Sequence, residues 1–352
     1  MRKKRRYYCY LSGELPSRGL PSYEVIAILK SFKENFDIIE FFDQVLLISA
    51  YNNICDLIVE RAAYVHGCGE VIFIITEANI KKITKAIKNY DFNSILDENS
   101  SFAVRIKKIK EYFPKILVEK MEREIGREIE TVVNKQISVN LKNPDILFLG
   151  IFTENKFIFG VNFKNTQRKN FRLRAPHTRP FFHPCGLDPF LARAMVNLSE
   201  INGSEIIYDP FCGTGSLLIE AALIGIKSVG SDISQKMVRG SSLNLKAFGI
   251  QDINIFRADS RKHCLNNRFC LVTDPPYGRA SSIYGKNLEK VLLDLFKNNS
   301  ELMVKNCFNV LALPSSLKID FLLLKYDFKI QHRFEYYVHR SLTRDIYVIK
   351  KM

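Results

Sequence analysis

The sequence has 352 residues, of which 47% are hydrophobic, and its 52 Lys and Arg residues exceed its 37 Asp and Glu residues to give a formal net charge of +15. This length and hydrophobic content exclude an intrinsically disordered chain and allow two or three domains with sizeable cores. The surplus of positive charge indicates a polyanionic partner, and nucleic acid is a better candidate than an anionic membrane surface.

The cysteine and hydropathy patterns predict a soluble, cytoplasmic protein that does not bind membranes. The eight cysteines are dispersed and include no Cys-x-x-Cys pair, which is typical of buried thiols in a reducing compartment rather than of a disulfide framework. Residues 7–18, which follow the basic head at 2–6, lack the continuous apolar core of a signal peptide. No apolar run approaches the roughly 18 residues that a membrane-spanning helix needs.

Residues 1–75 predict a ferredoxin-like domain. Val25, Ile28, Leu29 and Phe32 recur at helical spacing, which indicates a helix over 23–36. Apolar runs indicate strands on both sides of it, and a second helix separates the later strands. The repeated strand-helix-strand order is that of a ferredoxin-like fold. The elements are expected at 7–11, 23–36, 45–49, 53–64 and 70–76.

Residues 76–160 predict a second α+β domain in which no residues have catalytic spacing. Pro114 suits the first turn of a long helix, along which an apolar stripe recurs at about helical period. We interpret this stripe as core, and its members are Leu117, Met121, Ile125, Ile129 and Val132. The other elements are expected at 78–89, 101–107, 138–141, 146–152 and 157–163.

Residues 161–178 predict a basic linker. The wider stretch 155–187 contains seven Lys or Arg residues and no carboxylate, with Phe163 and Phe171 interleaved. Such a segment repels itself unless an anion runs along it, which favours RNA binding. The alternative is a solvated linker without a partner. The candidate RNA-binding residues are Lys164, Arg168, Lys169, Arg172, Arg174 and Arg179.

Residues 179–352 predict an α/β domain. Strands alternate with helices, which builds a parallel sheet covered on both faces. Helices are expected at 188–198, 216–224, 234–248 and 288–296. Strands are expected at 206–209, 227–232, 254–257, 269–273 and 307–312, with a terminal pair at 328–333 and 346–350.

Four consecutive strands of this domain are each predicted to end in an aspartate, namely Asp209, Asp232, Asp259 and Asp274. The first opens the glycine-rich loop 209–215, at the sheet edge where open α/β sheets bind ligands. An acidic group at the end of the second strand can accept hydrogen bonds from ribose hydroxyls. The loop is neither Gly-x-Gly-x-x-Gly nor a phosphate-binding P-loop, so the pattern favours S-adenosylmethionine over NAD or ATP.

The stretch Asp274-Pro275-Pro276-Tyr277-Gly278 is the strongest candidate for the reaction centre. Two consecutive prolines cannot continue a strand and make a stiff turn. The carboxylate and a free carbonyl can accept hydrogen bonds from a planar amine on which the tyrosine stacks. An ordinary Asp-Pro turn with a packing tyrosine is the alternative. The candidate catalytic residues are Asp274, Pro275, Pro276 and Tyr277.

These motifs together resemble those of class I S-adenosylmethionine-dependent methyltransferases that act on exocyclic amines. The matching stretches are 209–215, 230–232, 258–260 and 274–278. Residues 179–184 and 191–198 resemble the segment before the glycine loop of archaeal tRNA guanosine-10 N2-methyltransferases. Residues 1–155, including 139–145, resemble the ferredoxin-like plus THUMP module of that family. The resemblance covers nearly the whole chain, and only the basic head at 2–6 lacks a counterpart.

The resemblance implies a Rossmann-like class I methyltransferase domain at 179–352 behind a THUMP RNA-binding domain at 76–160. It also implies methyl transfer from S-adenosyl-L-methionine to the N2 amine of a guanosine in tRNA, without a metal. Asp274 would accept an N–H bond and the proton, the Pro275 carbonyl would accept the other N–H, and Tyr277 would stack on the base. The cofactor-binding residues would be Phe182, His183, Asp209, Cys212, Gly213, Thr214, Gly215, Asp232, Ile233, Asp259, Ser260 and Asp274.

Several alternatives stay open at this point. His183 is equally compatible with a turn, and Cys212 with packing. An N6-adenine RNA or DNA methyltransferase uses the same Asp-Pro-Pro-Tyr chemistry, a non-catalytic RNA-binding protein retains the same N-terminal module, and a dinucleotide-dependent oxidoreductase shares the sheet. We expect a monomer. Whether one or two methyl groups are added, and whether a small activating subunit binds, is not decided by the sequence.

Overall fold

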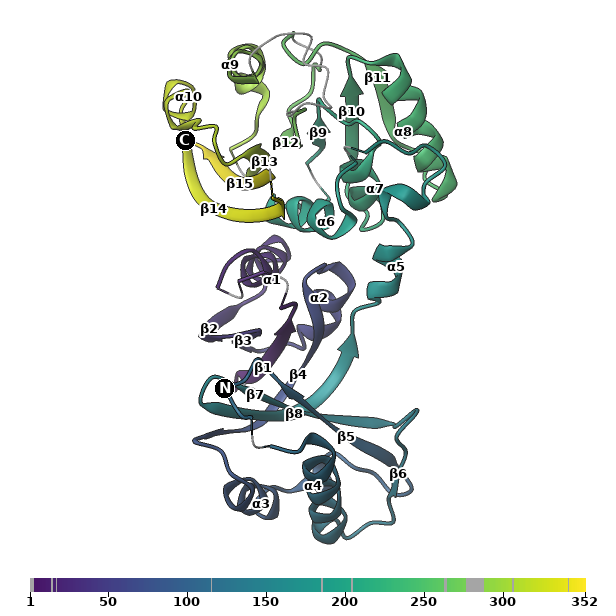
Figure 1. Ribbon diagram of the computed structural model, residues 1–352, viewed down its shortest axis with the longest axis vertical. Coiled ribbons are helices and arrows are strands. Elements are labelled where there is room, and N and C mark those ends of the chain that lie inside the picture. The colour runs from purple at the N-terminus through teal and green to yellow at the C-terminus, as the bar shows by residue number, and fades with distance from the viewer. Residues whose placement is uncertain are drawn as a thin grey trace. The chain divides into compact units, whose positions relative to one another are not determined.

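The computed structural model describes most of the 352-residue chain, and Figure 1 shows its helices and strands. The described residues are 3–13, 15–16, 18–114, 116–184, 186–203, 205–262, 265–276, 288–305, 307–340 and 342–352. They fold into two compact units. The first comprises Met1–Ser22, Glu34–Glu60 and Val65–Thr166, and the second comprises Tyr23–Lys33, Arg61–Tyr64 and Gln167–Met352.

The strands of the first unit are β1 (Arg5–Leu11), β2 (Phe36–Phe42), β3 (Val45–Ala50), β4 (Val65–Thr76), β5 (Ser101–Lys108), β6 (Ser138–Val139), β7 (Ile146–Thr153) and β8 (Lys156–Asn165). They form one eight-stranded sheet in the order β2-β3-β1-β4-β8-β7-β5-β6. The long strand β4 joins the two halves, because it pairs with β1 on one side and with β8 on the other. Gly69 permits this close approach, since a Cβ there would lie 2.0 Å from the Val161 carbonyl oxygen. The regions predicted at 1–75 and 76–160 therefore share one sheet.

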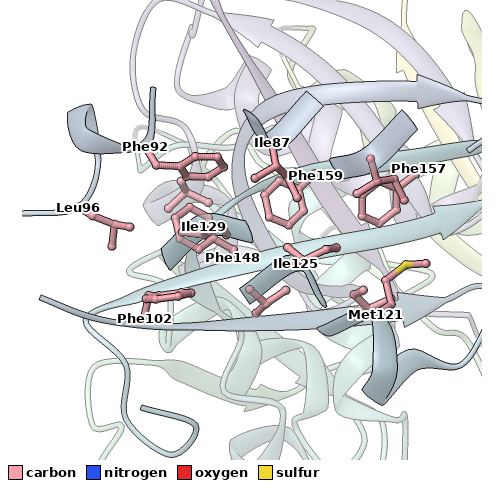
Figure 2. Packing of buried hydrophobic residues seen from close by; sticks show 14 of the residues in the cluster. Ile87, Phe92, Leu96, Phe102, Met121, Ile125, Ile129, Phe148, Phe157 and Phe159 are labelled. Atoms are coloured by element: carbon pink, nitrogen blue, oxygen red, sulfur yellow. The ribbon is translucent and has the colours of Figure 1, made fainter. Parts of the chain in front are cut away.

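The helices that accompany this sheet are α2 (Cys55–Arg61), α3 (Ile80–Lys88), η1 (Phe92–Ser94) and α4 (Val118–Val132). Met121, Ile125 and Ile129 of α4 are buried in one cluster with Phe148 of the sheet (Figure 2). The interpretation of the apolar stripe as core is confirmed for these three residues. Leu117 lies just outside the helix, with 71% of its surface exposed, because α4 begins only at Val118.

The helix predicted at 23–36 is shorter than expected, and its last residue belongs to a strand. Helix α1 (Leu20–Ser31) ends before Lys33, which adopts a left-handed conformation with a φ of 55° and so cannot continue an α-helix. The edge strand β2 follows, and it is absent from the elements predicted from the sequence. Ile38 and Ile39 of β2 are both exposed, so this strand lacks the alternation of buried and exposed positions by which a strand is recognised.

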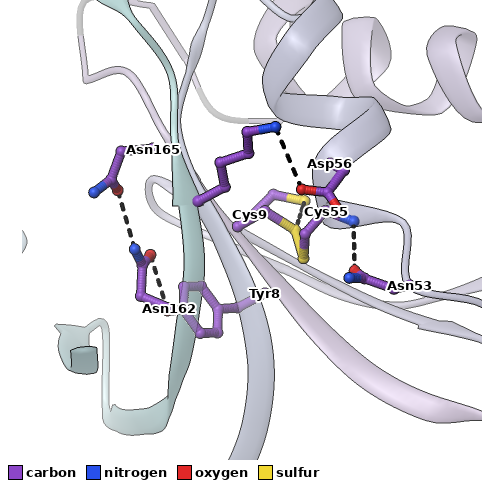
Figure 3. The surroundings of a disulfide bond; sticks show 9 residues. Tyr8, Cys9, Asn53, Cys55, Asp56, Asn162 and Asn165 are labelled. Carbon is purple, nitrogen blue, oxygen red and sulfur yellow. Dashed lines mark hydrogen bonds and ion pairs between the residues drawn. A yellow bond between two sulfur atoms is a disulfide. The ribbon is translucent and has the colours of Figure 1, made fainter. Parts of the chain in front are cut away.

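The cysteines differ from the sequence expectation. Cys55 and Cys68 form a disulfide across 13 residues, and Cys270 and Cys307 form another across 37. The expectation of unpaired thiols is therefore wrong for these four, because pairing depends on tertiary contacts and not on spacing. Cys9 is a free, buried thiol close to the first disulfide (Figure 3), with its Sγ 3.9 Å from that of Cys68. Burial raises the pKa of Cys9 to about 12.

The strands of the second unit are β9 (Ile207–Asp209), β10 (Ser228–Asp232), β11 (Asn254–Arg257), β12 (Cys270–Thr273), β13 (Asn309–Pro314), β14 (Phe328–His339) and β15 (Leu342–Lys351). They form a seven-stranded sheet in the order β11-β10-β9-β12-β13-β15-β14. The prediction of a parallel sheet is confirmed for β9 to β13. Strand β15 runs antiparallel to both β13 and β14.

The helices of the second unit are α5 (Arg168–Arg172), η2 (Pro176–Thr178), α6 (Pro189–Leu198), α7 (Ser216–Ala222), α8 (Gln235–Ala247), α9 (Leu288–Asn299), η3 (Ser300–Leu302) and α10 (Asp320–Lys325). Leu292 of α9 and Leu322 of α10 belong to one buried cluster, whereas Leu218 of α7 and Leu245 of α8 belong to another. Helices α5 and α10 have no counterpart among the elements predicted from the sequence. Among the described residues, no helix is long and apolar enough to cross a membrane.

A buried carboxylate fixes the N-terminal segments that belong to the second unit. Glu24 of α1 is fully buried and accepts hydrogen bonds from the backbone N–H groups of Ala63 at 2.8 Å and Tyr64 at 2.9 Å. It also accepts one from Nδ2 of Asn197 on α6 at 2.8 Å. Burial raises the pKa of Glu24, and these hydrogen bonds oppose the rise. The segments 23–33 and 61–64 are therefore bonded directly to the framework of the parallel sheet's unit.

Candidate active site

Four aspartates lie at one edge of the second unit's sheet, as the sequence predicts. Asp209 and Asp232 are the last residues of β9 and β10, Asp274 directly follows β12, and Asp259 comes two residues after β11 ends. These strands are parallel neighbours, so their carboxyl ends share an edge (Figure 1). The chain places β10 and β11 on one side of β9 and β12 on the other. The order in which the chain adds strands therefore reverses between β9 and β12. Open α/β sheets bind ligands at such a switch point.

The glycine-rich loop after β9 is tied to the next strand. The Gly213 N–H donates to Oδ2 of Asp232 at 3.1 Å. Gly213 and Gly215 have positive φ angles of 50° and 82°, a region that side chains other than glycine rarely adopt. A Cβ at Gly215 would also lie 2.6 Å from Oγ of Ser241 on α8. The loop therefore needs glycine at 215 for its backbone conformation, and a side chain there would also displace the Ser241 hydroxyl.

Asp209 is buried and hydrogen-bonds to the backbone of this loop rather than facing solvent. It is only 2% exposed, and its Oδ1 accepts hydrogen bonds from Oγ1 of Thr273 at 2.7 Å and from the Phe211 N–H at 3.2 Å. Burial raises the pKa of Asp209 to about 7, and the neighbouring charges of Asp274 and Asp232 add to the rise. Asp209 therefore holds a proton for part of the time near neutral pH.

Asp232 is half-buried and is bonded to the backbone on both sides of the site. Its Oδ1 accepts from the Ser234 N–H at 2.8 Å, while its Oδ2 accepts from Gly213. Burial raises the pKa of Asp232, and these bonds together with the nearby His183 oppose the rise. The structure thus brings three of the predicted cofactor-binding residues together, namely Asp232, Gly213 and His183.

The remaining predicted cofactor-binding residues differ in their exposure. Phe182 and Ile233 are 54% and 44% exposed, so both present apolar surface. Ser260 is buried. The Asp259 carboxylate is engaged by Arg261, whose Nε donates to Oδ1 at 2.8 Å, and this ion pair lowers the pKa of Asp259. Cys212 and Thr214, which belong to the loop, are both buried.

The predicted reaction centre is only partly described. Asp274 is paired with an arginine that the sequence analysis did not single out, since Oδ2 of Asp274 lies 3.2 Å from Nη2 of Arg344. Pro275 is buried and Pro276 is half-buried. Tyr277 and Gly278 lie outside the described residues. Asp274 and Arg344 are too far apart in the sequence for residue spacing to predict that they pair.

Two of the six predicted RNA-binding residues are buried within the second unit. Arg174 makes a bidentate pair with the fully buried Glu220 at 2.7 and 3.0 Å. Arg179 donates to Oγ of Ser216 at 2.7 Å and is 5% exposed. Both guanidinium groups are used inside the protein, so neither offers the exposed charge that the prediction assumed. Burial lowers the pKa of Arg179 to about 10.

The other four basic residues differ among themselves. Lys164, in the first unit, pairs with Glu60 at 2.8 Å. Arg168 lies over the Phe190 ring, 4.5 Å from its centroid. Lys169 and Arg172 of α5 are exposed. The prediction of a basic surface along this segment therefore rests mainly on these last two side chains.

Asn244 is a further residue that the sequence analysis missed. Its buried side chain accepts from the Phe181 N–H at 2.8 Å and donates to the carbonyls of Phe181 and Thr214 at 3.0 Å each. One amide group thus joins the segment before α6 to the glycine loop. No periodicity distinguishes this asparagine from other polar residues of α8, so no sequence signal was available.

The family comparisons agree with this geometry. The family model described as "RMKL-like, methyltransferase domain" matches residues 176–346, and that of the THUMP domain matches residues 77–162. The chain is 34% identical over 343 residues to the tRNA (guanine(10)-N2)-dimethyltransferase of Methanothermobacter thermautotrophicus, covering 97% of this chain and 98% of that protein. It is 33% identical to the protein of the same name from Methanocaldococcus jannaschii, covering 97% and 99% of the two chains.

Solved structures share the fold across the whole length. TrmN from Thermus thermophilus is 17% identical, with a TM-score of 0.56 over 99% of this chain and 100% of that chain. A methyltransferase candidate crystallised in complex with SAH is 14% identical, with a TM-score of 0.57 over 100% and 99% of the two chains. The predicted architecture, a THUMP module before a Rossmann-like methyltransferase domain, is thereby confirmed.

Proposed function

This chain belongs to the tRNA (guanine(10)-N2)-dimethyltransferase family, and on that premise we propose that it methylates the exocyclic N2 amine of guanosine 10 in tRNA. The methyl donor is S-adenosyl-L-methionine. The observation that carries the proposal is the Asp274-Pro275-Pro276 corner, which follows β12 at the switch point of the parallel sheet. A hydrogen-bond acceptor held at that edge suits an amine that must lose a proton during transfer.

The charge of the sheet edge supports this donor over a nucleotide with phosphates. Asp232 lies there beside the glycine loop and accepts hydrogen bonds from backbone N–H groups, and its negative charge disfavours a diphosphate and favours a sulfonium cation. Asp232 at the end of β10 suits the ribose hydroxyls. The exposed faces of Phe182 and Ile233 offer apolar surface for an adenine ring. When bound, S-adenosyl-L-methionine supplies an electrophilic methyl group.

Asp274 and its neighbours have distinct roles in the proposed reaction. The guanine amine is a weak nucleophile because its lone pair is delocalised into the ring, and positive charge develops on the nitrogen as it attacks. Asp274 accepts one N–H bond, stabilises that charge and takes the proton. The Pro275 carbonyl accepts the second N–H and so directs the lone pair. Tyr277 stacks on the base and holds it at attack distance.

Two successive transfers follow from the name that the relatives carry. After the first transfer the amine retains a single N–H, so the second transfer uses one acceptor instead of two. Asp274 is the acceptor that must be kept, since it alone can take the proton.

A base within a helical stem must first be unstacked, at a cost of a few kcal/mol. Contacts of the THUMP module and of exposed cations with the tRNA would offset that cost.

The proposal is tested by incubating an unmodified tRNA transcript with labelled S-adenosyl-L-methionine and identifying the products by nucleoside mass spectrometry. We expect N2-methylguanosine and then N2,N2-dimethylguanosine, and no label in a transcript with adenosine at position 10. Label in N6-methyladenosine would favour the adenine-specific alternative. A chain that binds tRNA without any transfer would favour a non-catalytic RNA-binding protein. The monomeric state and the cytoplasmic location stay predictions.

A further inference from the structure

Arg344 reaches the edge at which Asp274 lies because of the direction of one strand. Strand β13 runs parallel to β12, so both end at that edge. Strand β15 runs antiparallel to β13, with Arg344 opposite Pro314, the last residue of β13. The first residues of β15 therefore lie where the parallel strands end. This brings Nη2 of Arg344 to 3.2 Å from Oδ2 of Asp274, with the two side chains 12% and 13% exposed.

We propose that Arg344 is a positioning residue for methyl transfer, which orients the Asp274 carboxylate and keeps it ionised. The inference rests on the proposed function and adds a residue to it. A guanidinium group against one carboxylate oxygen limits rotation of the carboxylate, and its positive charge favours the charged form of its neighbour. Only an ionised Asp274 can take a proton from the amine. Arginine suits this role better than lysine because its charge persists when it is buried.

The acidic surroundings explain why Asp274 needs a positive neighbour. Asp209 lies close enough for the Asp274 charge to raise the pKa of Asp209, so the two carboxyl groups interact unfavourably when both are ionised. Arg344 supplies a nearly buried charge of the opposite sign. The pair is too little exposed for water to screen it as it screens surface ion pairs.

A second arginine–aspartate pair in the same sheet provides a matched control. Arg333 of β14 pairs with Asp345, the residue next to Arg344 in β15, and this pair involves no residue of the candidate site. If the pairs merely hold strands together, Arg344→Gln and Arg333→Gln should have similar effects. If Arg344 acts through Asp274, only Arg344→Gln should change the rate of transfer.

The test compares steady-state kinetics of wild type, Arg344→Gln, Arg344→Lys and Arg333→Gln on a tRNA transcript, with thermal unfolding as a check of folding. We expect Arg344→Gln to lower kcat by roughly 10–100-fold, since small misplacements of a reacting group cost that much. KM for tRNA and the Kd for S-adenosyl-L-methionine should stay within about threefold of wild type. Arg344→Lys should recover part of kcat, because lysine keeps the positive charge but lacks the planar guanidinium group. Arg333→Gln should keep the wild-type kcat.

Three outcomes would overturn the role of Arg344. The first is a folded Arg344→Gln variant with wild-type kcat. The second is an equal loss of kcat in Arg333→Gln. The third applies if Arg344→Gln does not fold, and it is a folded Arg344→Lys variant with wild-type kcat, since lysine cannot reproduce the guanidinium geometry. If wild type methylates no tRNA guanosine, the proposed function itself fails. An active wild type with unaffected Arg344 variants contradicts only this inference.

Discussion

Asp274 is the residue on which methyl transfer should depend most. Asp274→Ala removes the proposed proton acceptor, and Asp274→Asn keeps its shape without its charge. We expect both to lower kcat by at least roughly 100-fold, within the range that general base catalysis contributes. The Kd for S-adenosyl-L-methionine by calorimetry and the Kd for tRNA should change little. Loss of tRNA affinity with normal turnover would contradict the role given to Asp274.

Asp209 should make the stability of the second unit depend on pH. Its pKa is raised to about 7 in the folded protein, against about 3.9 for an unfolded aspartate. Between these values the folded state holds a proton that the unfolded state releases, so the free energy of unfolding falls as the pH rises.

The variant Asp209→Asn cannot titrate and should lack this loss. Relative to wild type, it should gain roughly 1–4 kcal/mol in free energy of unfolding between about pH 4 and pH 8. Urea unfolding at the two pH values measures the change, with Asp252→Asn as an exposed control. A difference between variant and wild type that is independent of pH would show that Asp209 does not titrate in this range.

At the scale of single elements, the glycine loop between β9 and α7 combines two demands on one residue. Gly215 has a φ of 82°, and an added Cβ would lie 2.6 Å from Oγ of Ser241. Gly225 has a similar φ of 74°, but a Cβ there would meet nothing within 4 Å. Alanine at either position strains the backbone by about 1 kcal/mol or more, and only Gly215→Ala adds a clash.

Gly215→Ala should therefore unfold at a lower temperature than Gly225→Ala and bind S-adenosyl-L-methionine more weakly. Gly225→Ala should keep wild-type affinity, because Gly225 follows the C-terminal end of α7, whereas the glycine loop precedes its N-terminal end. Thermal unfolding and calorimetry compare the two variants directly. Equal effects of both substitutions would mean that the backbone conformation matters and the packing against Ser241 does not.

At the scale of the whole molecule, the net charge of +15 should make tRNA binding strongly dependent on salt, because bound cations displace counterions from phosphates. Lys169 and Arg172 of α5 are the exposed members of the basic segment. The double variant Lys169→Ala/Arg172→Ala should weaken tRNA binding and reduce the slope of log K against log salt by about 1 per lost contact. Filter binding at several salt concentrations measures the slope.

The control for this prediction removes the same charge elsewhere. Lys290 and Lys297 of α9 are also exposed, and Lys290→Ala/Lys297→Ala lowers the net charge by the same amount. We expect a smaller change of slope from it, since the prediction assigns phosphate contacts to α5 and not to α9. Equal slopes for the two double variants would indicate general electrostatic attraction without a specific role of the basic segment.

The sequence by itself determined which edge of the parallel sheet carries the candidate active site. Asp209, Asp232 and Asp274 were recognised because each follows an apolar strand, and parallel strands must bring their carboxyl ends to one edge. The glycine loop and the apolar stripe of α4 were likewise predicted from local spacing. These features depend on neighbours in the chain, which is why periodicity and turn chemistry suffice to find them.

Only the tertiary structure decided which polar groups meet. It paired Arg344 with Asp274, withdrew Arg174 and Arg179 into the protein, and assigned disulfides to cysteines predicted to be unpaired. It also joined the two predicted N-terminal regions into one sheet through β4. These outcomes depend on strand order and direction across tens of residues. The sequence shows that a residue is basic, but not where its side chain lies in the folded protein. That location decides whether the side chain meets a phosphate, a catalytic carboxylate or a buried glutamate.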